Sequence, residues 1–99
     1  MLDLEPYEEE VLVRMYDKRL IGMDYKPIQV VRSKVNWEEI ARTYRLKKSF
    51  EKMIRHLSNK GYVDTHGKGG NVASLTRLGV SYVRGILLER KSKEERKPS

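Results

Sequence analysis

The fold of this chain is decided by the stretch from Tyr44 to Thr76, which reads YRLKKSFEKMIRHLSNKGYVDTHGKGGNVASLT. In its first half, apolar side chains recur at the spacing of one helix face, namely Phe50, Met53, Ile54 and Leu57. In its second half, two β-prone runs flank a glycine-rich tip. We therefore predict a helix over about residues 47–59 that stops at Gly61, followed by a β-hairpin over residues 62–75 with its tip at 67–71.

Positive charge is concentrated in the same part of the chain. The segment from Arg42 to Arg77 has nine Lys and Arg residues and two acidic residues, a net charge of +7, which equals the net charge of the whole 99-residue chain. Six basic and nine acidic residues precede it (net −3), and six basic and three acidic residues follow it (net +3). A positive field localised in this way favours a polyanionic partner, either a nucleic acid or an anionic membrane surface.

The predicted helix places this charge on the face opposite its apolar stripe. That face carries cations and hydrogen-bonding side chains: Lys47, Lys48, Ser49, Lys52, Arg55 and Asn59. Most charged helix faces are only solvated, but here Glu51 is the sole carboxylate, and this lack of balancing acids favours a binding face. His56 lies nearer to the apolar side, and we expect it to be a packed or surface histidine.

The hairpin tip is the second candidate contact, because Lys68 stands among three glycines on a backbone-exposed turn. Such a lysine suits a sugar–phosphate backbone. The glycines do not match the phosphate-binding loop of nucleotide hydrolases, which needs Gly-Lys-Ser/Thr opening a helix, whereas Asn71 leads into a second strand.

Two further helices are predicted before this stretch. The first lies within residues 1–21, with Asp3 as its N-cap, Pro6 in its first turn and Gly22 as its stop. Its apolar side is formed by Tyr7, Val11, Leu12, Met15, Tyr16 and Leu20. The second spans residues 36–44, where Asn36 and Glu39 have the spacing of a capping box. We expect Trp37 to lie in the core rather than to stack on a base.

Residues 23–35 are less clearly patterned. Pro27 breaks a helix, and Ile28, Val30 and Val31 favour extended structure, so the preferred interpretation is a loop with a short strand. A short helix from Pro27 to Arg32 is the competing interpretation.

After the hairpin, Thr76 is the predicted cap of a helix that reaches at least Leu88. Its apolar stripe is broader than one-sided packing requires: Leu78, Val80, Tyr82, Val83, Ile86, Leu87 and Leu88. This breadth predicts a homodimer that forms through the N- and C-terminal helices. Residues 89–99 contain no apolar side chain, so we expect one domain over residues 1–90 and a frayed or disordered charged tail over residues 91–99.

Composition excludes several other classes of protein. There is no cysteine for a disulfide or thiolate metal site, and two histidines alone cannot build a metal centre. No secretory signal or bilayer-spanning run is evident, so we expect a cytoplasmic, nucleoid-associated protein without membrane contact. We find no nucleophile–base pattern and expect no enzymatic activity, no small-molecule substrate, no metal and no cofactor. The high Lys, Arg and Glu content resembles that of heat-adapted, thermophilic proteins.

The predicted order of helix, short strand, helix, basic helix, glycine-tipped hairpin and helix resembles the winged helix-turn-helix domain. It is most similar to small archaeal regulators of the MarR/PadR-like type. The resemblance rests on three segments. WEEIARTY (37–44) matches the helix before the turn, IRHLSNKGYV (54–63) matches the end of the basic helix and the start of the wing, and LTRLG (75–79) matches the end of the wing and the start of the last helix. The resemblance implies an α+β, mostly α fold.

It also implies double-stranded DNA as the partner of a homodimeric transcription regulator. The basic helix would lie in the major groove and the hairpin would touch the adjacent backbone. The implied DNA-binding residues are Arg45, Lys47, Lys48, Ser49, Lys52, Arg55, Asn59, Lys68 and Arg77. Arg55 and Asn59 can make bidentate contacts to base edges, and the lysines, Arg45 and Arg77 suit phosphates. A non-specific chromatin-type DNA binder, an RNA- or ribosome-binding winged helix and a protein-interaction winged helix remain alternatives.

Overall fold

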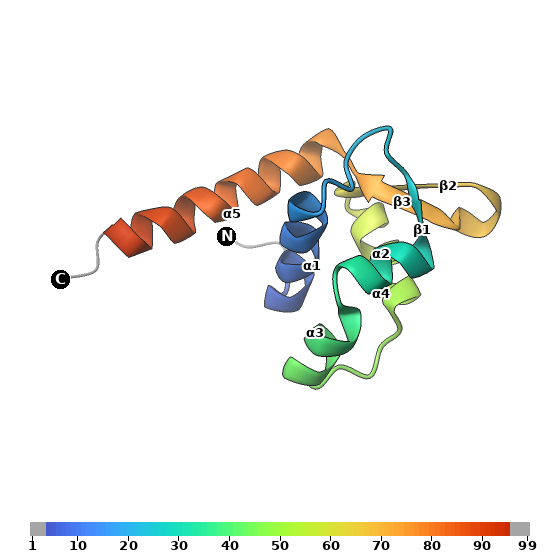
Figure 1. Cartoon of the computed structure of the whole chain (residues 1–99), viewed down its shortest axis with the longest axis horizontal. Coiled ribbons are helices and arrows are strands. Elements are labelled where there is room, and N and C mark those ends of the chain that lie inside the picture. The colour runs from blue at the N-terminus through green and yellow to red at the C-terminus, as the bar shows by residue number, and fades with distance from the viewer. Residues whose placement is uncertain (1–3, 96–99) are drawn as a thin grey trace.

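The computed structural model of the chain describes residues 4–95, apart from the side chain of Glu95. These residues form five α-helices and a three-stranded antiparallel sheet (Figure 1). The elements are α1 (Pro6–Asp17), β1 (Lys26–Pro27), α2 (Ile28–Lys34), α3 (Trp37–Thr43), α4 (Phe50–Asn59), β2 (Val63–His66), β3 (Val72–Leu75) and α5 (Arg77–Glu95). The prediction of an α+β, mostly helical fold is confirmed.

The sheet has the order β1-β3-β2, and β2 and β3 form the predicted hairpin. Its register pairs Val63 with Leu75 and His66 with Val72. A 3₁₀ turn, η1 (Lys68–Gly70), closes the tip. Figure 1 shows that the hairpin projects from the helices at one end of the molecule. At the tip, the Asn71 carbonyl accepts the Ile28 N–H at 2.9 Å, so the hairpin is also tied to the start of α2.

The core lies between α4, α1, α3 and the inner face of the sheet. All four residues of the predicted apolar stripe of α4 are buried, and so are Val11, Leu12 and Met15 of α1. Trp37 is 4% exposed and packs on Phe50, with 5.4 Å between the ring centroids, which confirms that it is a core residue. Helix α4 therefore buries one face completely and leaves the other to solvent.

Helix α1 is shorter than we predicted at both ends. Its N-cap is Glu5 rather than Asp3, which lies outside the described residues. It ends at Asp17, and Arg19 with φ 60° turns the chain away before Gly22 is reached. The early end lets Leu20 and Gly22 join the sheet edge through backbone hydrogen bonds to Leu75.

The preferred interpretation of residues 23–35 was wrong in its main part. A two-residue strand is present, but Ile28–Lys34 is helical, as in the competing interpretation. Pro27 precedes the helix instead of interrupting it, a position that proline tolerates well. Val31 is fully buried, so burial outweighs the extended preference of the β-branched residues.

The capping box predicted for α3 does not form. Asn36 has φ 55° and ψ 60°, and its side chain makes no cap hydrogen bond. Only Val35 and Asn36 separate α2 from α3, so the backbone needs a left-handed residue to turn the corner, a conformation that asparagine tolerates better than most residues. Helix α3 itself is confirmed.

Helix α5 begins as predicted, with the Thr76 Oγ1 accepting a hydrogen bond from the Gly79 N–H at 3.0 Å. It continues to Glu95, so residues 91–95 belong to the helix rather than to the predicted tail, and residues 96–99 lie outside the described part. Figure 1 shows α5 running beside α1 and extending beyond it. Within residues 4–95 no helix is long and apolar enough to cross a bilayer.

One close contact fixes the start of α5 against the hairpin. Gly79 is buried, and a Cβ at this position would lie 2.2 Å from the Tyr62 carbonyl oxygen. Glycine is therefore required by backbone packing here. By contrast, a Cβ on Gly85 of the same helix would meet nothing within 4 Å.

These two glycines give a matched test of the packing. We expect Gly79→Ala to lower the free energy of unfolding by about 1–3 kcal/mol, because the added methyl group overlaps the backbone. Gly85→Ala should raise it by up to about 1 kcal/mol, because alanine is the better helix former. Urea denaturation of both variants measures this. If both substitutions changed the free energy of unfolding equally and in the same direction, the close contact between Gly79 and the Tyr62 carbonyl would be contradicted.

Candidate nucleic-acid interface

The exposed face of α4, together with the connection before it, carries a concentration of basic side chains. Residues 45–60 contain six Lys and Arg residues and one carboxylate, Glu51. The outer face of the helix carries Glu51, Lys52, Arg55, His56 and Asn59, all exposed. Within residues 4–95, neither Lys52 nor Arg55 forms an ion pair. These two cations therefore remain available to a partner.

The helix begins three residues later than predicted, at Phe50. The Ser49 hydroxyl caps it by accepting the Lys52 N–H at 3.2 Å, so Lys47 and Lys48 belong to the connection between α3 and α4. In this connection Arg45 is exposed and has φ 55°, a strained conformation for a residue with a side chain. The connection thus brings its cations to the N-terminal end of α4.

Lys48 is used inside the molecule. Its Nζ donates a hydrogen bond to the Tyr7 hydroxyl at 2.7 Å, and this bond raises the pKa of the lysine. Tyr7 also meets Tyr44 edge to face, with 6.2 Å between the ring centroids. Lys48 was predicted to face a DNA groove, but in the structure it ties the connection before α4 to the start of α1.

A small cleft of about 170 Å³ lies between α4 and the hairpin. One wall comes from the helix through Glu51, Arg55 and Ser58, and the other from the hairpin through Thr65 and the backbone of Gly69 and Gly70. The structure therefore brings the two predicted contact elements together, with Arg55 at their junction.

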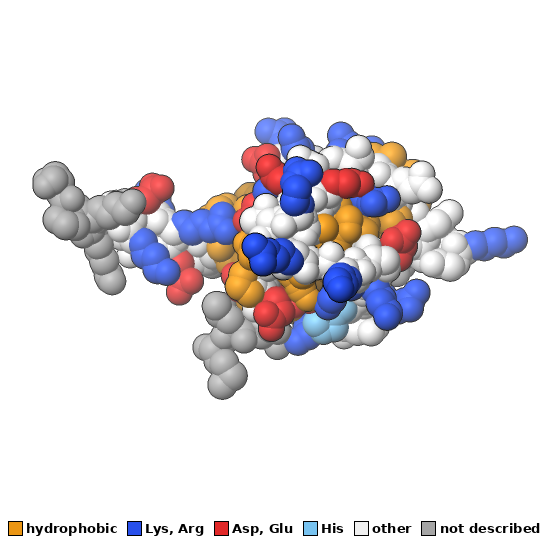
Figure 2. Space-filling view, turned by 90° about the horizontal axis from the view of Figure 1, so that it is seen from below, with side chains coloured by type: hydrophobic (Ala, Val, Ile, Leu, Met, Phe, Trp, Pro, Cys, Tyr) orange, Lys and Arg blue, Asp and Glu red, His pale blue; other side chains and the backbone are white. Residues whose placement is uncertain are grey.

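Lys68 is exposed and is the only Lys or Arg between residues 63 and 75. Figure 2 shows basic side chains spread among acidic ones on the surface seen from below, and one basic side chain at the end where the hairpin projects. Arg77 is exposed but lines a different cleft, together with Gly22 and Tyr25. Lys68 therefore stands next to the glycines that line the cleft with α4, whereas Arg77 lies at a different cleft.

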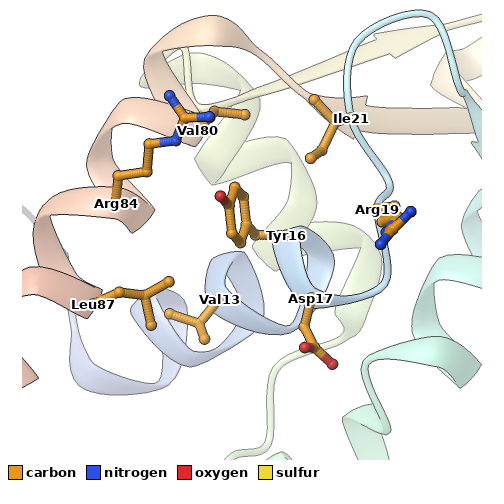
Figure 3. Close-up of a pocket in the computed structure, with 8 residues that line it drawn as sticks. All are labelled: Val13, Tyr16, Asp17, Arg19, Ile21, Val80, Arg84 and Leu87. Atoms are coloured by element: carbon orange, nitrogen blue, oxygen red, sulfur yellow. The ribbon is translucent and has the colours of Figure 1, made fainter. Parts of the chain in front are cut away.

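A larger concave feature lies elsewhere, between α1 and α5. This groove of about 570 Å³ has an apolar floor with charged residues at its edge: Val13, Tyr16, Ile21, Val80 and Leu87, with Asp17, Arg19 and Arg84 (Figure 3). Beyond it, Leu88 is 69% exposed on α5. The broad apolar stripe predicted for this helix is therefore only partly covered within one chain.

Helix α4 is fixed on α1 by a buried carboxylate that the sequence did not single out. Glu8 is 1% exposed, and its Oε1 accepts the Glu5 N–H at 2.9 Å. Its Oε2 contacts the Nδ1 of His56 on α4. The half-exposed His56 is thus a packing partner of α1, as its position near the apolar side suggested.

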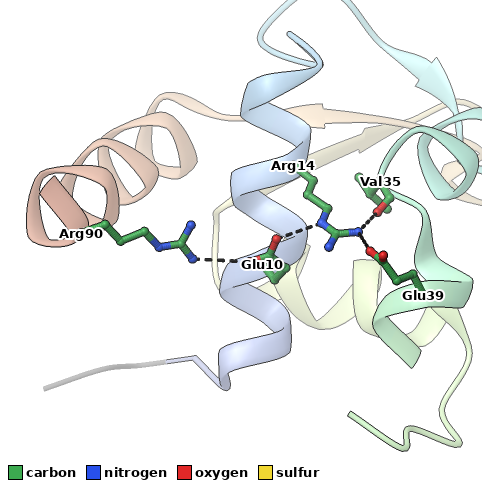
Figure 4. Close-up of polar contacts among 5 residues, drawn as sticks. All are labelled: Glu10, Arg14, Val35, Glu39 and Arg90. Carbon is green, nitrogen blue, oxygen red and sulfur yellow. Dashed lines mark hydrogen bonds and ion pairs between the residues drawn. The ribbon is translucent and has the colours of Figure 1, made fainter. Parts of the chain in front are cut away.

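A second polar connection holds α3 and α5 on α1 (Figure 4). The Arg14 guanidinium binds Glu10 at 2.9 Å and Glu39 of α3 at 2.8 Å, and it donates to the Val35 carbonyl at 2.9 Å. Glu10 in turn contacts Arg90 of α5 at 3.4 Å. Glu39 therefore contributes to this network and not to a capping box.

The base of the hairpin is tied to the loop before β1. The Tyr25 hydroxyl donates to the Asp64 Oδ2 at 2.9 Å, and the His66 Nε2 contacts the same oxygen at 3.0 Å. The Tyr25 and His66 rings meet edge to face, with 4.4 Å between their centroids. The hydrogen bond from Tyr25, followed by that from His66, holds the pKa of Asp64 below its ordinary value of 3.8. Tyr25 and Asp64 are 39 residues apart in sequence, so no local pattern could predict that contact.

Comparison of the chain with protein-family models, curated protein sequences and solved structures finds no match.

The Asp64 cluster predicts how stability depends on pH. Since the carboxyl of Asp64 ionises at lower pH in the folded chain than in the unfolded chain, its contribution is complete above the unfolded pKa and is lost as pH falls through the folded pKa. We expect wild type to lose stability more steeply than Asp64→Asn below about pH 4. Urea midpoints measured from about pH 5 to 2 test this.

Asp24→Asn is the control, because Asp24 is an exposed carboxylate in the loop before β1 that pairs with Lys26 at 3.0 Å and not with Tyr25. It should keep the steep acid dependence of wild type. Parallel curves for wild type and Asp64→Asn would show that the cluster does not stabilise the hairpin.

Proposed function

We propose that this chain is a winged helix-turn-helix protein that binds double-stranded DNA as a homodimeric transcription regulator. In this proposal α3 and α4 are the helix-turn-helix, α4 enters the major groove, and the β2–β3 hairpin is the wing on the adjacent backbone. The observation that carries it is the outer face of α4, where unpaired cations stand next to a hairpin that ends in Lys68.

The positions of the side chains refine the predicted roles. Arg45, Lys47, Lys52 and Lys68 are exposed around α4 and suit phosphates, which position a protein without reading sequence. Arg55 is the sixth of the ten residues of α4, near the middle of the helix, and is a better-placed candidate for a guanine edge than Asn59. Asn59 is the last residue of the helix, so it is a weaker candidate, since base contacts come mainly from the N-terminal part of such helices.

Binding is proposed rather than catalysis. Ser74 faces Asp64 across the hairpin near His66, but its hydroxyl donates to the Gly22 carbonyl at 2.7 Å and is buried. It is therefore not poised as a nucleophile. A cytoplasmic, nucleoid-associated location follows from the proposed partner.

Three other functions use the same basic face: non-specific chromatin-type DNA binding, RNA or ribosome binding, and docking of an acidic protein. Footprinting at one defined site separates a regulator from a non-specific binder. Competition between duplex DNA and structured RNA of equal length separates DNA binding from RNA or ribosome binding. Reversing the charge of Lys52 and Arg55 without any loss of nucleic-acid affinity would favour a protein partner.

Salt dependence tests the DNA proposal directly. If Arg45, Lys47, Lys52 and Lys68 lie on phosphates and Arg55 adds its charge in the groove, each chain neutralises about five charges of the duplex. The logarithm of duplex affinity should then fall against the logarithm of salt concentration with a slope of about −4 to −5 per bound chain. Lys52→Ala should reduce the magnitude of the slope by about 1, and Lys18→Ala, an exposed cation at the far end of α1, should leave it unchanged. Absence of binding at low salt would refute the proposal.

The dimer is proposed to form through the groove between α1 and α5. Its apolar floor continues into a second surface on α5 lined by Leu87, Leu88, Arg84 and Lys91. A second copy supplies the same exposed leucines, and the basic end of α5 offers cations to Asp17 at the groove edge. Packing of α5 from a second copy would bury this surface.

Two leucines of α5 provide a matched test. Wild type should sediment at twice the monomer mass of 11.7 kDa, and Leu88→Glu should give a monomer, because a carboxylate would be forced into an apolar contact. Leu78→Glu is the control, since Leu78 is also exposed, at 53%, but does not line the groove. Dissociation by both variants, or by neither, would argue against this seam.

A further inference from the structure

One side chain of the cleft between α4 and the hairpin is not explained by attraction to phosphate. Glu51 lines this cleft with Arg55 and Ser58. It is exposed and forms no ion pair or hydrogen bond with another side chain of residues 4–95. A carboxylate at this place repels the DNA backbone, so it weakens the sequence-independent part of binding.

A purely structural role accounts for only part of this placement. Glu51 lies in the first turn of α4, where a carboxylate interacts favourably with the helix dipole. That interaction does not depend on which side of the helix the carboxylate occupies, and Ser49 already caps the backbone. Yet Glu51 stands on the side that carries Arg55 one turn later, facing the hairpin.

The major groove offers this pair of side chains one matching target. An ionised carboxylate only accepts hydrogen bonds, and the donor that it reads best is the N4 amino group of cytosine. Arginine reads the O6 and N7 acceptors of guanine. Four residues along a helix correspond to a rise of about 6 Å. Stacked base pairs are about 3.4 Å apart, so the two side chains reach the same pair or neighbouring pairs.

We propose that Glu51 is a specificity-determining residue that accepts a hydrogen bond from the cytosine amino group of a G·C pair, next to a guanine bound by Arg55. This inference rests on the proposed DNA-binding function and adds a sequence preference to it. Glu51 is the second residue of α4, within the N-terminal part of the helix that contacts base edges in this docking mode. The carboxylate would lower the affinity for DNA of any sequence and raise the preference for sites with this G·C pair.

The experiment starts with selection of the preferred duplex by wild type from a randomised pool. Affinities are then measured for that duplex and for one in which the selected G·C pair is replaced by A·T. Wild type should prefer G·C by about five- to tenfold, the lower end of what one base contact supplies. Glu51→Ala should lose this preference and bind both duplexes more tightly, because one negative charge is removed. Glu51→Gln should shift the preference towards A·T, because glutamine reads adenine.

Glu89→Ala is the charge-matched control, since it removes an exposed carboxylate from α5 far along the chain. It should leave the base preference unchanged. Thermal melts of the three variants confirm that they fold. A G·C preference that survives in Glu51→Ala, or its absence in wild type, would overturn this inference while DNA binding stands. Failure of wild type to bind any duplex would overturn the proposed function as well.

Discussion

The contact between Glu8 and His56 is the constraint on which the arrangement of the basic helix depends. Glu8 is the one charged side chain that is buried among residues 4–95. A buried carboxylate is tolerated only where its oxygens are satisfied, and here one oxygen accepts a backbone N–H of α1 while the other meets α4. The polar contact adds to the apolar packing of α4, because a shift of α4 along α1 would separate His56 from the buried carboxylate.

Those parts of the fold that rest on periodicity could be predicted from the sequence. The stripe from Phe50 to Leu57, the glycine-tipped hairpin and the Thr76 cap all depend on residues close together in the chain. The failures came where tertiary context outweighed local preference. Asn36 fits a capping box by spacing, yet the two-residue corner between α2 and α3 imposed a left-handed backbone. Residues 28–34 have β-branched side chains, yet burial of Val31 made them helical.

In the candidate interface, too, local sequence patterns predicted some features and tertiary contacts determined the others. Local charge identified α4 and Lys68, because unbalanced cations on one helix face are visible in the sequence. It could not show that Lys48 bonds to Tyr7, 41 residues away, or that Arg77 turns to another cleft. It also treated Glu51 as a minor exception to a basic face. The structure shows that Glu51 lines the cleft between α4 and the hairpin together with Arg55, and this position is not evident from the sequence.

The length of helix α5 affects how far apart two hairpins would lie in a dimer. Its 19 residues extend over about 28 Å, and its first turn is clamped to the hairpin by the contact between Gly79 and Tyr62. Two chains joined through α5 would hold their hairpins at a separation set by a rigid rod. In the proposed DNA-bound dimer, the length of this helix would set the number of base pairs between two half-sites. Inserting residues into it would change that number and rotate one half of the dimer around the duplex.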